Sequence, residues 1–446
     1  MRNIFAVVLL FVFHCRAVAQ TPAEKMDALV NAYAKMYKFT GTVLVAQKGK
    51  VIFEKGYGFK NAKDSTYNDV QTVFQIGSIT KQFTSAVILQ LQEQHKLSVH
   101  DKLSKYFPAY AKADSITIEN LLTHTSGIYN YTNDNHFMSS EATKPATQEK
   151  MWSLFKDKPL DFSPGTNWSY SNTGYVLLGY IIEKVTGQPY ETVMRNNIFR
   201  PLGMTHSGFD FAHFTSKDKA TGYFVYTEKS KVPSPIVDST ASYAAGAIYT
   251  TVGDLLKWNE GLLTDKIISQ ASLKKAYTPV KNHYGYGWGI DSLYGKRVIS
   301  HGGGIFGFNT NIARVTEDDV CVVLLNNTSN PSLSEITNKL LAIVYQRPYE
   351  IPKEKIAIAV DSTVLLDYVG EYELGPGVII KFFIDKGHFK TQITGQPSLD
   401  LYAETSTKFF LKVVDASVEF FGNAEGKVDK VKLYQGGRIT EAKRVK

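Results

Sequence analysis

A serine stands three residues before a lysine where an apolar helical pattern begins, within residues 75–84. Positions three apart lie on one face of a helix, so the amine of Lys81 can reach the hydroxyl of Ser78. A serine hydroxyl is a weak nucleophile until a neighbouring base takes its proton. The start of a helix also offers free backbone N–H groups, which favour a negatively charged oxygen. The pair therefore predicts a nucleophilic serine beside an amine at a helix N-terminus.

The spacing alone is not specific, because three other serine–lysine pairs share it, at residues 153/156, 216/219 and 272/275. A helix-capping serine followed by a solvated lysine would give the same pattern. What separates Ser78 from the other pairs is the order of two later motifs. These are Tyr170-Ser171-Asn172 and His301-Gly302-Gly303.

The first of these motifs supplies groups that complement a serine–lysine pair. Lys81 and Tyr170 can share the transfer of a proton, and we expect a phenol beside such groups to ionise more easily than in water. Asn172 can hold Lys81 and donate to a substrate carbonyl. Read alone, Tyr170 would better suit a core aromatic capped by a hydrogen bond, and Asn172 a turn residue. The residues do not distinguish Lys81 from Tyr170 as the first base.

Taken together, the three motifs resemble those of the serine β-lactamase and penicillin-binding-protein superfamily, especially its class C β-lactamase, DD-peptidase, D-aminopeptidase and esterase branch. Residues 77–84 and 121–128 also look like that branch, and the likeness covers residues 24–347. It implies an α/β (α+β) fold, with an antiparallel sheet flanked by helices. It further implies an acyl-enzyme on Ser78, an oxyanion hole from the N–H groups of Ser78 and Gly304, and neither metal nor cofactor.

The third motif departs from the β-lactamase pattern, which usually has Lys-Thr-Gly where this chain has His301-Gly302-Gly303. We expect these three residues to bind substrate, with glycines that let the backbone approach closely. A histidine is only partly charged near neutral pH, so we expect weaker recognition of a β-lactam carboxylate, improving as the pH falls. The segment also matches the oxyanion loop of α/β-hydrolase lipases. That fold needs a later Gly-x-Ser-x-Gly motif, which does not follow Gly304.

The first 19 residues have the pattern of a secretory signal peptide. Arg2 precedes a short apolar run, and Ala17-Val18-Ala19 forms a small-x-small cleavage pattern. We therefore expect an exported protein, periplasmic or extracellular, with no stable membrane anchor. Cleavage would leave Cys321 as the one cysteine, inside an apolar strand-like run, where a buried structural thiol is expected.

Composition narrows the class of partner. The formal net charge is +8 and the lysines are spread along the chain rather than forming a basic stripe with aromatic residues. This argues against nucleic-acid binding and favours a small-molecule or peptide substrate. Partner proteins are left open. His124, His206 and His283 have no metal-ligand spacing, so we expect ordinary hydrogen-bonded or surface histidines.

The chain divides into a hydrolase domain over 22–347, a linker over 348–362 and a small all-β, barrel-like domain over 363–446 that resembles a lipocalin-like appendage. Its role is open between shaping the cleft, binding a partner and simple packing. Near the motifs we expect a helix over 175–185, strands over 284–290 and 298–300, and irregular loops over 128–160.

The function expected from these features is an exported serine hydrolase that cleaves amide or ester bonds of D-amino-acid peptides, small esters or β-lactams. The alternative is a non-catalytic, penicillin-binding-like sensor or scaffold. The complete set Ser78, Lys81, Tyr170 and Asn172 favours the enzyme, because binding alone does not need all four.

Overall fold

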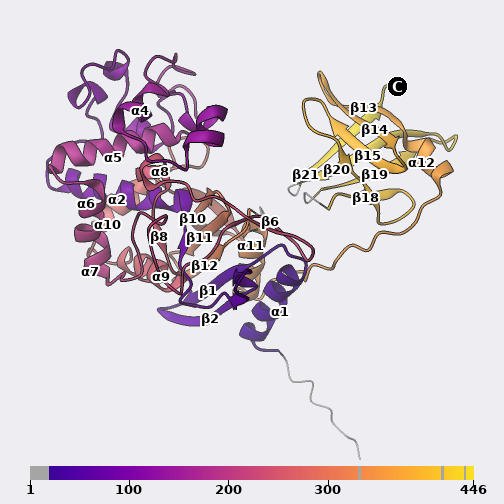
Figure 1. The fold of residues 1–446 in the computed structure, drawn as a ribbon, viewed down its shortest axis with the longest axis horizontal. Coiled ribbons are helices and arrows are strands. Elements are labelled where there is room, and N and C mark those ends of the chain that lie inside the picture. Colours follow the sequence, from indigo (N-terminus) through magenta and orange to yellow (C-terminus); the bar gives the residue numbers. More distant parts are fainter. Residues whose placement is uncertain (1–19, 330–332, 413–415, 436–437) are drawn as a thin grey trace, which may run out of the picture. The chain divides into compact units, whose positions relative to one another are not determined.

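The computed structural model describes residues 20–329, 333–412, 416–435 and 438–446 (Figure 1). The signal peptide predicted at residues 1–19 lies outside this range. The chain separates into two compact units between Pro352 and Lys353, within the segment predicted as a linker. Within the described residues, no helix is long and apolar enough to cross a membrane.

The first unit is built on a six-stranded antiparallel sheet in the order β2-β1-β12-β11-β10-β9, most of whose strands are labelled in Figure 1. Both faces of its central strands are buried. Val43 and Val45 of β1 face one core, whereas Leu44 and Ala46 face the other. This explains the continuous apolar run of such strands, since neighbouring side chains point to opposite faces. The strands are β1 Gly41–Gln47, β2 Lys50–Tyr57, β9 Gly289–Leu293, β10 Lys296–Ile305, β11 Phe308–Val315 and β12 Val320–Asn326.

Two helices cover one face of the sheet. They are α1 Pro22–Lys35 and α11 Leu333–Val344, and their apolar sides share a core with the strands. The capping box at Thr21 and Glu24 starts α1 by satisfying its first free N–H groups.

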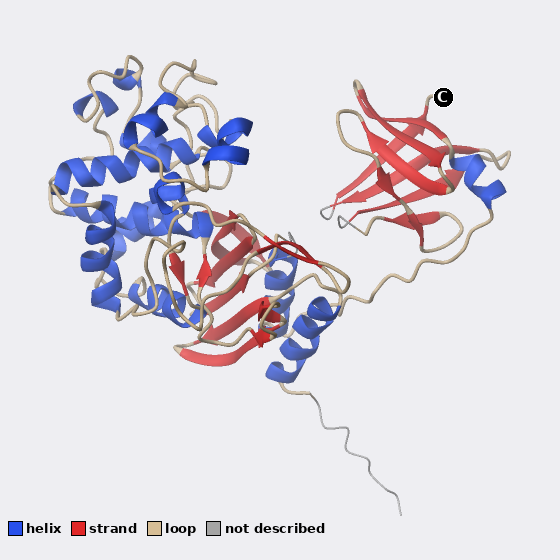
Figure 2. Cartoon of the chain, in the orientation of Figure 1, coloured by secondary structure: helices blue, strands red, loops and turns tan. Residues whose placement is uncertain are grey.

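A cluster of helices covers the other face (Figure 2). Its central member, α2, is buried from Thr80 to Leu91, so this helix links the sheet to the rest of the cluster. The cluster comprises α2 Thr80–Glu93, α3 Ile118–Leu122, α4 Gln148–Ser153, α5 Asn172–Thr186, α6 Tyr190–Met194, α7 Arg200–Leu202, α8 Ser239–Gly246, α9 Val252–Gly261 and α10 Gln270–Ala276. Three short two-stranded sheets complete the unit: β3 Phe59–Asn61 with β4 Thr66–Tyr67, β5 Phe74–Gln75 with β8 Tyr249–Thr250, and β6 Tyr223–Tyr226 with β7 Lys231–Pro233.

The structure changes four of the expected elements near the motifs. Residues 128–160, expected to be irregular loops, contain helix α4 Gln148–Ser153. Strand β10 runs through the glycines to Ile305, because Gly302, Gly303 and Gly304 pair in register with β11. Helix α5 begins at Asn172, three residues before the predicted start. Residues 284–288 form no strand apart from an isolated bridge at Tyr284, and strand β9 starts only at Gly289.

The second unit is a nine-stranded antiparallel sheet that forms a nearly closed barrel, as the barrel-like prediction requires. Its interior is filled by aromatic side chains, including those of Tyr372, Phe382, Phe389 and Phe420. The elements are α12 Ser362–Tyr368, β13 Gly370–Gly375, β14 Val378–Asp385, β15 His388–Ile393, β16 Leu399–Asp400, β17 Tyr402–Ala403, β18 Lys408–Phe410, β19 Ala416–Gly422, β20 Val428–Gln435 and β21 Arg438–Arg444.

Candidate active site

Ser78 lies in a tight 3-10 turn, Gly77–Ile79, that leads directly into α2. Gly77 has a left-handed φ of 52°, which glycine adopts without strain. A Cβ atom on Gly77 would lie 2.9 Å from the backbone nitrogen of Gly304, so the turn packs closely against the end of β10. The serine hydroxyl is half-buried and faces the groups described below.

Lys81 is fully buried one turn further along and makes three polar contacts. Its Nζ lies 2.9 Å from Ser78 Oγ, 2.8 Å from Asn172 Oδ1 and 2.8 Å from the carbonyl oxygen of Ala245. Burial lowers the pKa of this amine well below 10.5. A neutral amine has two N–H donors and one lone pair. The two oxygens that can only accept take the donors, which leaves the lone pair for the Ser78 hydroxyl.

The Ala245 carbonyl is delivered by α8, an element that the sequence analysis did not anticipate. Within this helix Tyr243 has a left-handed φ of 37° with ψ −133°, a conformation that costs about 1–3 kcal/mol for a non-glycine residue. Immediately after it, the carbonyl of Ala244 accepts from Thr84 Oγ1 at 2.7 Å and that of Ala245 accepts from Lys81. A backbone carbonyl has no side-chain signature, so no motif could have pointed to it.

Tyr170 lies close to Ser78, near enough for the serine side chain to lower the pKa of the phenol. Its ring centroid is 4.9 Å from Lys81 Nζ. Burial raises the pKa of this phenol, and Ser78 offsets only part of that rise. The expectation that Tyr170 ionises more easily than in water is therefore wrong. The phenol is a neutral hydrogen-bonding group, and Lys81 is the better proton acceptor.

His124 holds the backbone on both sides of Tyr170. Its carbonyl oxygen accepts from the N–H of Ser169 at 3.0 Å, and its ring Nδ1 accepts from the N–H of Ser171 at 3.2 Å. The imidazole and phenol rings are 4.2 Å apart. Burial, with a further effect from Lys81, lowers the pKa of His124 well below 6.5. The ring is thus neutral and its Nδ1 lone pair stays available. His124 is a hydrogen-bonded histidine, with a positioning role that its sequence context did not reveal.

Asn172 is oriented by groups from a neighbouring loop. Its backbone N–H donates to Asn130 Oδ1 at 3.0 Å, and its Nδ2 donates to Thr132 Oγ1 at 3.2 Å. These two bonds, together with the contact to Lys81, define which way the amide points. The supporting residues lie in a stretch that the sequence analysis read as irregular loop. Its richness in asparagine and tyrosine was the only available signal.

The glycine motif borders the site through an open strand edge. Strand β9 pairs with β10 only as far as Ser300. Beyond Ser300, this edge of β10 does not pair with β9 and instead lies against the turn that carries Ser78. A Cβ on Gly303 would lie 1.9 Å from the carbonyl oxygen of Ile76, whereas nothing lies within 4 Å of the equivalent point on Gly304. Gly303 is therefore needed for close packing, and Gly304 borders open space.

The side chain of His301 is turned inward from this edge. Its Nε2 is 2.8 Å from the hydroxyl of Tyr284 and its Nδ1 is 2.6 Å from the carbonyl oxygen of Gly302. Burial, followed by the proximity of Lys81, lowers the pKa of His301 to about 3. The expectation that this ring gains charge as the pH falls towards mildly acidic values is therefore wrong. Substrate contact at His301 stays a prediction.

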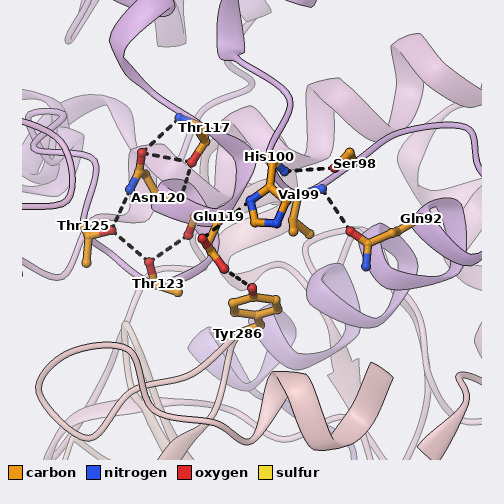
Figure 3. A network of polar contacts seen from close by, with 10 residues as sticks. All are labelled: Gln92, Ser98, Val99, His100, Thr117, Glu119, Asn120, Thr123, Thr125 and Tyr286. Carbon is orange, nitrogen blue, oxygen red and sulfur yellow. Dashed lines mark hydrogen bonds and ion pairs between the residues drawn. The ribbon is translucent and has the colours of Figure 1, made fainter. Parts of the chain in front are cut away.

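A polar network behind the site anchors the 121–128 stretch that carries His124 (Figure 3). Asn120 Nδ2 donates to Thr125 Oγ1 at 3.0 Å, and Thr123 Oγ1 donates to the carbonyl of Glu119 at 2.7 Å. The hydroxyl of Tyr286 donates to the Glu119 carboxylate. This links α3 to the turn before β9, so His124 extends from a tightly bonded segment.

Comparison with known proteins places this geometry in context. Residues 26–346 match the protein family described as Beta-lactamase, and residues 354–443 match DUF3471, a domain of unknown function. Penicillin-binding protein 4* of Bacillus subtilis (strain 168) is 27% identical over 452 residues, covering 96% of this chain and 100% of that protein. The putative penicillin-binding protein PbpX of the same organism is 34% identical over 322 residues, covering 71% and 78%. The solved structure of a D-stereospecific amidohydrolase from Streptomyces sp. is 26% identical, with a TM-score of 0.61, covering 72% of this chain and 98% of that one.

Proposed function

The chain belongs to the Beta-lactamase family as a homologue of penicillin-binding proteins, and we propose that it is an exported serine hydrolase that forms an acyl-enzyme on Ser78. The observation that carries the proposal is the contact set of Lys81. A buried amine that gives its N–H groups to Asn172 and Ala245 keeps its lone pair for the Ser78 hydroxyl. That arrangement is what a general base for a serine requires.

The reaction then follows from these positions. Lys81 takes the proton of Ser78 as Oγ attacks the substrate carbonyl, and the resulting oxyanion lies near the backbone N–H groups of Ser78 and Gly304. Collapse of this intermediate breaks the bond to the leaving group, which receives the proton through Lys81 and the Tyr170 hydroxyl. Water then attacks the ester on Ser78 by the reverse route and releases the acid.

We propose neutral amides and esters, including those of D-amino acids, as the substrate class. The likeness to a D-stereospecific amidohydrolase supports a D-configured acyl group. The buried, neutral ring of His301 supplies no positive charge for a substrate carboxylate, which disfavours β-lactams.

Labelling of the full chain with a fluorophosphonate probe, followed by peptide mapping, tests the nucleophile. The other serine–lysine pairs serve as internal controls, because their serines bond elsewhere: Ser153 donates to the carbonyl of Lys150, and Ser216 accepts from the N–H of Asp218. An adduct on Ser78 alone supports the enzyme. An unlabelled protein would instead indicate a non-catalytic binding protein.

Export is the part of the proposal that rests on residues 1–19. Expression in a bacterial host with fractionation and N-terminal sequencing tests it. A mature chain that begins at Gln20 outside the cytoplasm supports the proposal, and an intact chain that begins at Met1 in the cytoplasm contradicts it.

A further inference from the structure

A cavity of about 330 Å³ opens beside Ser78, within the size range of small-molecule sites. Besides Ser78, Asn172 and Gly304, its wall is largely aromatic and aliphatic. The apolar part is formed by Tyr131, Met138, Phe224, Val237, Ile305 and Phe306. No lining residue among those described carries a formal charge.

The hydroxyl groups in this wall are largely occupied by the protein itself. The hydroxyl of Tyr131 donates to the carbonyl of Ala241 at 2.8 Å, and that of Ser242 donates to the carbonyl of Asp238 at 3.2 Å. Asn172 already uses its Oδ1 on Lys81 and one donor on Thr132. A ligand therefore meets mainly carbon surface, with the reacting groups at one end.

Two aromatic residues at the cavity carry apolar surface that is partly open to solvent. Phe224 of β6 is 46% exposed, and its ring lies 5.5 Å from that of Phe306, at an interplanar angle of 62°. A large exposed aromatic beside a cavity marks a surface that a ligand can cover. Because Phe224 comes from the β6–β7 hairpin and Phe306 from the turn between β10 and β11, separate segments contribute to one apolar wall.

The position of the cavity relative to Tyr170 indicates which part of a substrate it receives. A leaving group must depart next to the group that returns its proton. Tyr170, which lies close to Ser78, does not belong to the cavity wall. The part of the substrate that stays attached to Ser78 is therefore the part that enters the cavity.

We infer that this cavity selects substrates whose acyl group is bulky, apolar and uncharged, such as a medium-chain or arylalkyl acyl group. This inference rests on the proposed function and specifies its substrate class. A carboxylate placed in the cavity would lose water without gaining a counter-charge, which is strongly unfavourable. Each buried methylene, in contrast, favours binding about fourfold.

Hydrolysis of p-nitrophenyl esters by the full chain tests the inference, since the leaving group stays constant while the acyl group changes. We expect kcat/KM to rise about tenfold or more from the acetate through the butyrate to the hexanoate and 3-phenylpropionate. We also expect mono-p-nitrophenyl adipate, the monoacid, whose acyl chain ends in a carboxylate, to be a poorer substrate. Its kcat/KM should be at least about tenfold lower than that of the same ester with the carboxylate converted to a methyl ester. A series flat within about threefold, or a monoacid as good as its methyl ester, would overturn the inference.

Two substitutions assign the effect to the cavity. Phe224→Ala should reduce the ratio of kcat/KM for the hexanoate to kcat/KM for the acetate. Phe224→Lys should raise kcat/KM for the monoacid relative to kcat/KM for its methyl ester. Val232→Ala is the matched control, because Val232 is 45% exposed on the partner strand β7 and lies outside the cavity wall. If both Phe224 variants keep the same substrate ratios as Val232→Ala, the assignment to the cavity is contradicted. Thermal melts check that each variant is folded.

Fluorophosphonate labelling separates the two levels of failure. If Ser78 is labelled and Ser78→Ala abolishes acetate hydrolysis, the proposed function stands, and a flat acyl series then refutes the specificity alone. If Ser78 is unlabelled and no ester is hydrolysed, the proposed function fails and the inference fails with it.

Discussion

The ring Nδ1 of His124 accepts the backbone N–H of Ser171 at 3.2 Å, one residue beyond Tyr170. The carbonyl oxygen of the same histidine accepts the N–H of Ser169 at 3.0 Å, one residue before it. Tyr170 is therefore held between two hydrogen bonds to a single residue. His124 acts on the reaction through the position of the tyrosine.

Replacing His124 by asparagine should slow the reaction through Tyr170. Asparagine tolerates the left-handed φ of 59° at this position, so the backbone is not strained, but its side chain lacks the ring that packs on the phenol. We expect kcat/KM on a p-nitrophenyl ester to fall about 10- to 100-fold, because small misplacements of catalytic groups cost that much. In a Tyr170→Phe background the same substitution should have little further effect. Fully multiplicative losses would show that His124 acts on something other than the tyrosine hydroxyl.

The lowered pKa of Lys81 predicts a pH-dependent stability. Between the folded-state pKa and 10.5 the unfolded chain binds a proton that the folded chain does not, so this residue makes stability rise with pH. Relative to Lys81→Met, the wild type should gain up to about 1.4 kcal/mol per pH unit as the pH rises from the folded-state pKa of Lys81 towards 10.5.

Urea denaturation followed by tryptophan fluorescence measures this difference. All four tryptophans precede Pro352, so the signal reports the first unit alone. Ser78→Ala is the control, because it keeps the lysine and should keep the wild-type slope. A difference between wild type and Lys81→Met that stays constant with pH would mean that the buried amine is not shifted.

Two adjacent glycines should respond differently to a methyl group. A Cβ on Gly303 would lie 1.9 Å from the carbonyl of Ile76, whereas one on Gly302 would be in ordinary contact at 3.7 Å from that of Thr310. Gly303→Ala should lower the free energy of unfolding by about 1–3 kcal/mol and slow labelling of Ser78, since the turn must shift. Gly302→Ala should change the free energy of unfolding by less than about 0.5 kcal/mol. Similar stability losses in the two variants would argue against close packing at Gly303.

The preference between neutral and carboxylate substrates should not depend on pH near neutrality. The pKa of His301 is lowered to about 3, so the ring stays uncharged at about pH 6 and at about pH 8 alike. The ratio of kcat/KM for a neutral ester to that for its carboxylate analogue should be flat over this range. A ratio that shifts towards the carboxylate at the lower pH would show that His301 becomes charged there.

The sequence predicts which residues meet in this site better than it predicts whether their side chains are charged. Ser78, Lys81 and Asn172 are joined by hydrogen bonds in the structure, although the asparagine is 91 residues from the lysine. The neutral states of Tyr170 and His301 were not predictable, because burial depends on packing by distant segments. The motifs implied that Tyr170 ionises easily and that His301 is partly charged, whereas the fold buries both side chains in their neutral forms.

Local propensity also misjudged two backbone elements. A run of three glycines favours a loop, yet pairing with β11 makes it a strand, because tertiary context overrides weak β propensity. Helix α8 has no clear apolar period and contains a strained tyrosine, so its carbonyl contact with Lys81 left no trace in the pattern of residues.

Acid-quenched mass spectrometry of the full chain, mixed for a short time with p-nitrophenyl hexanoate, measures the covalent intermediate directly. We predict a mass increase equal to hexanoic acid less water, mapped to the peptide that contains Ser78 and absent from Ser78→Ala. Ester turnover with no acylated protein, or acylation that maps to another residue and persists in Ser78→Ala, would contradict an acyl-enzyme on Ser78.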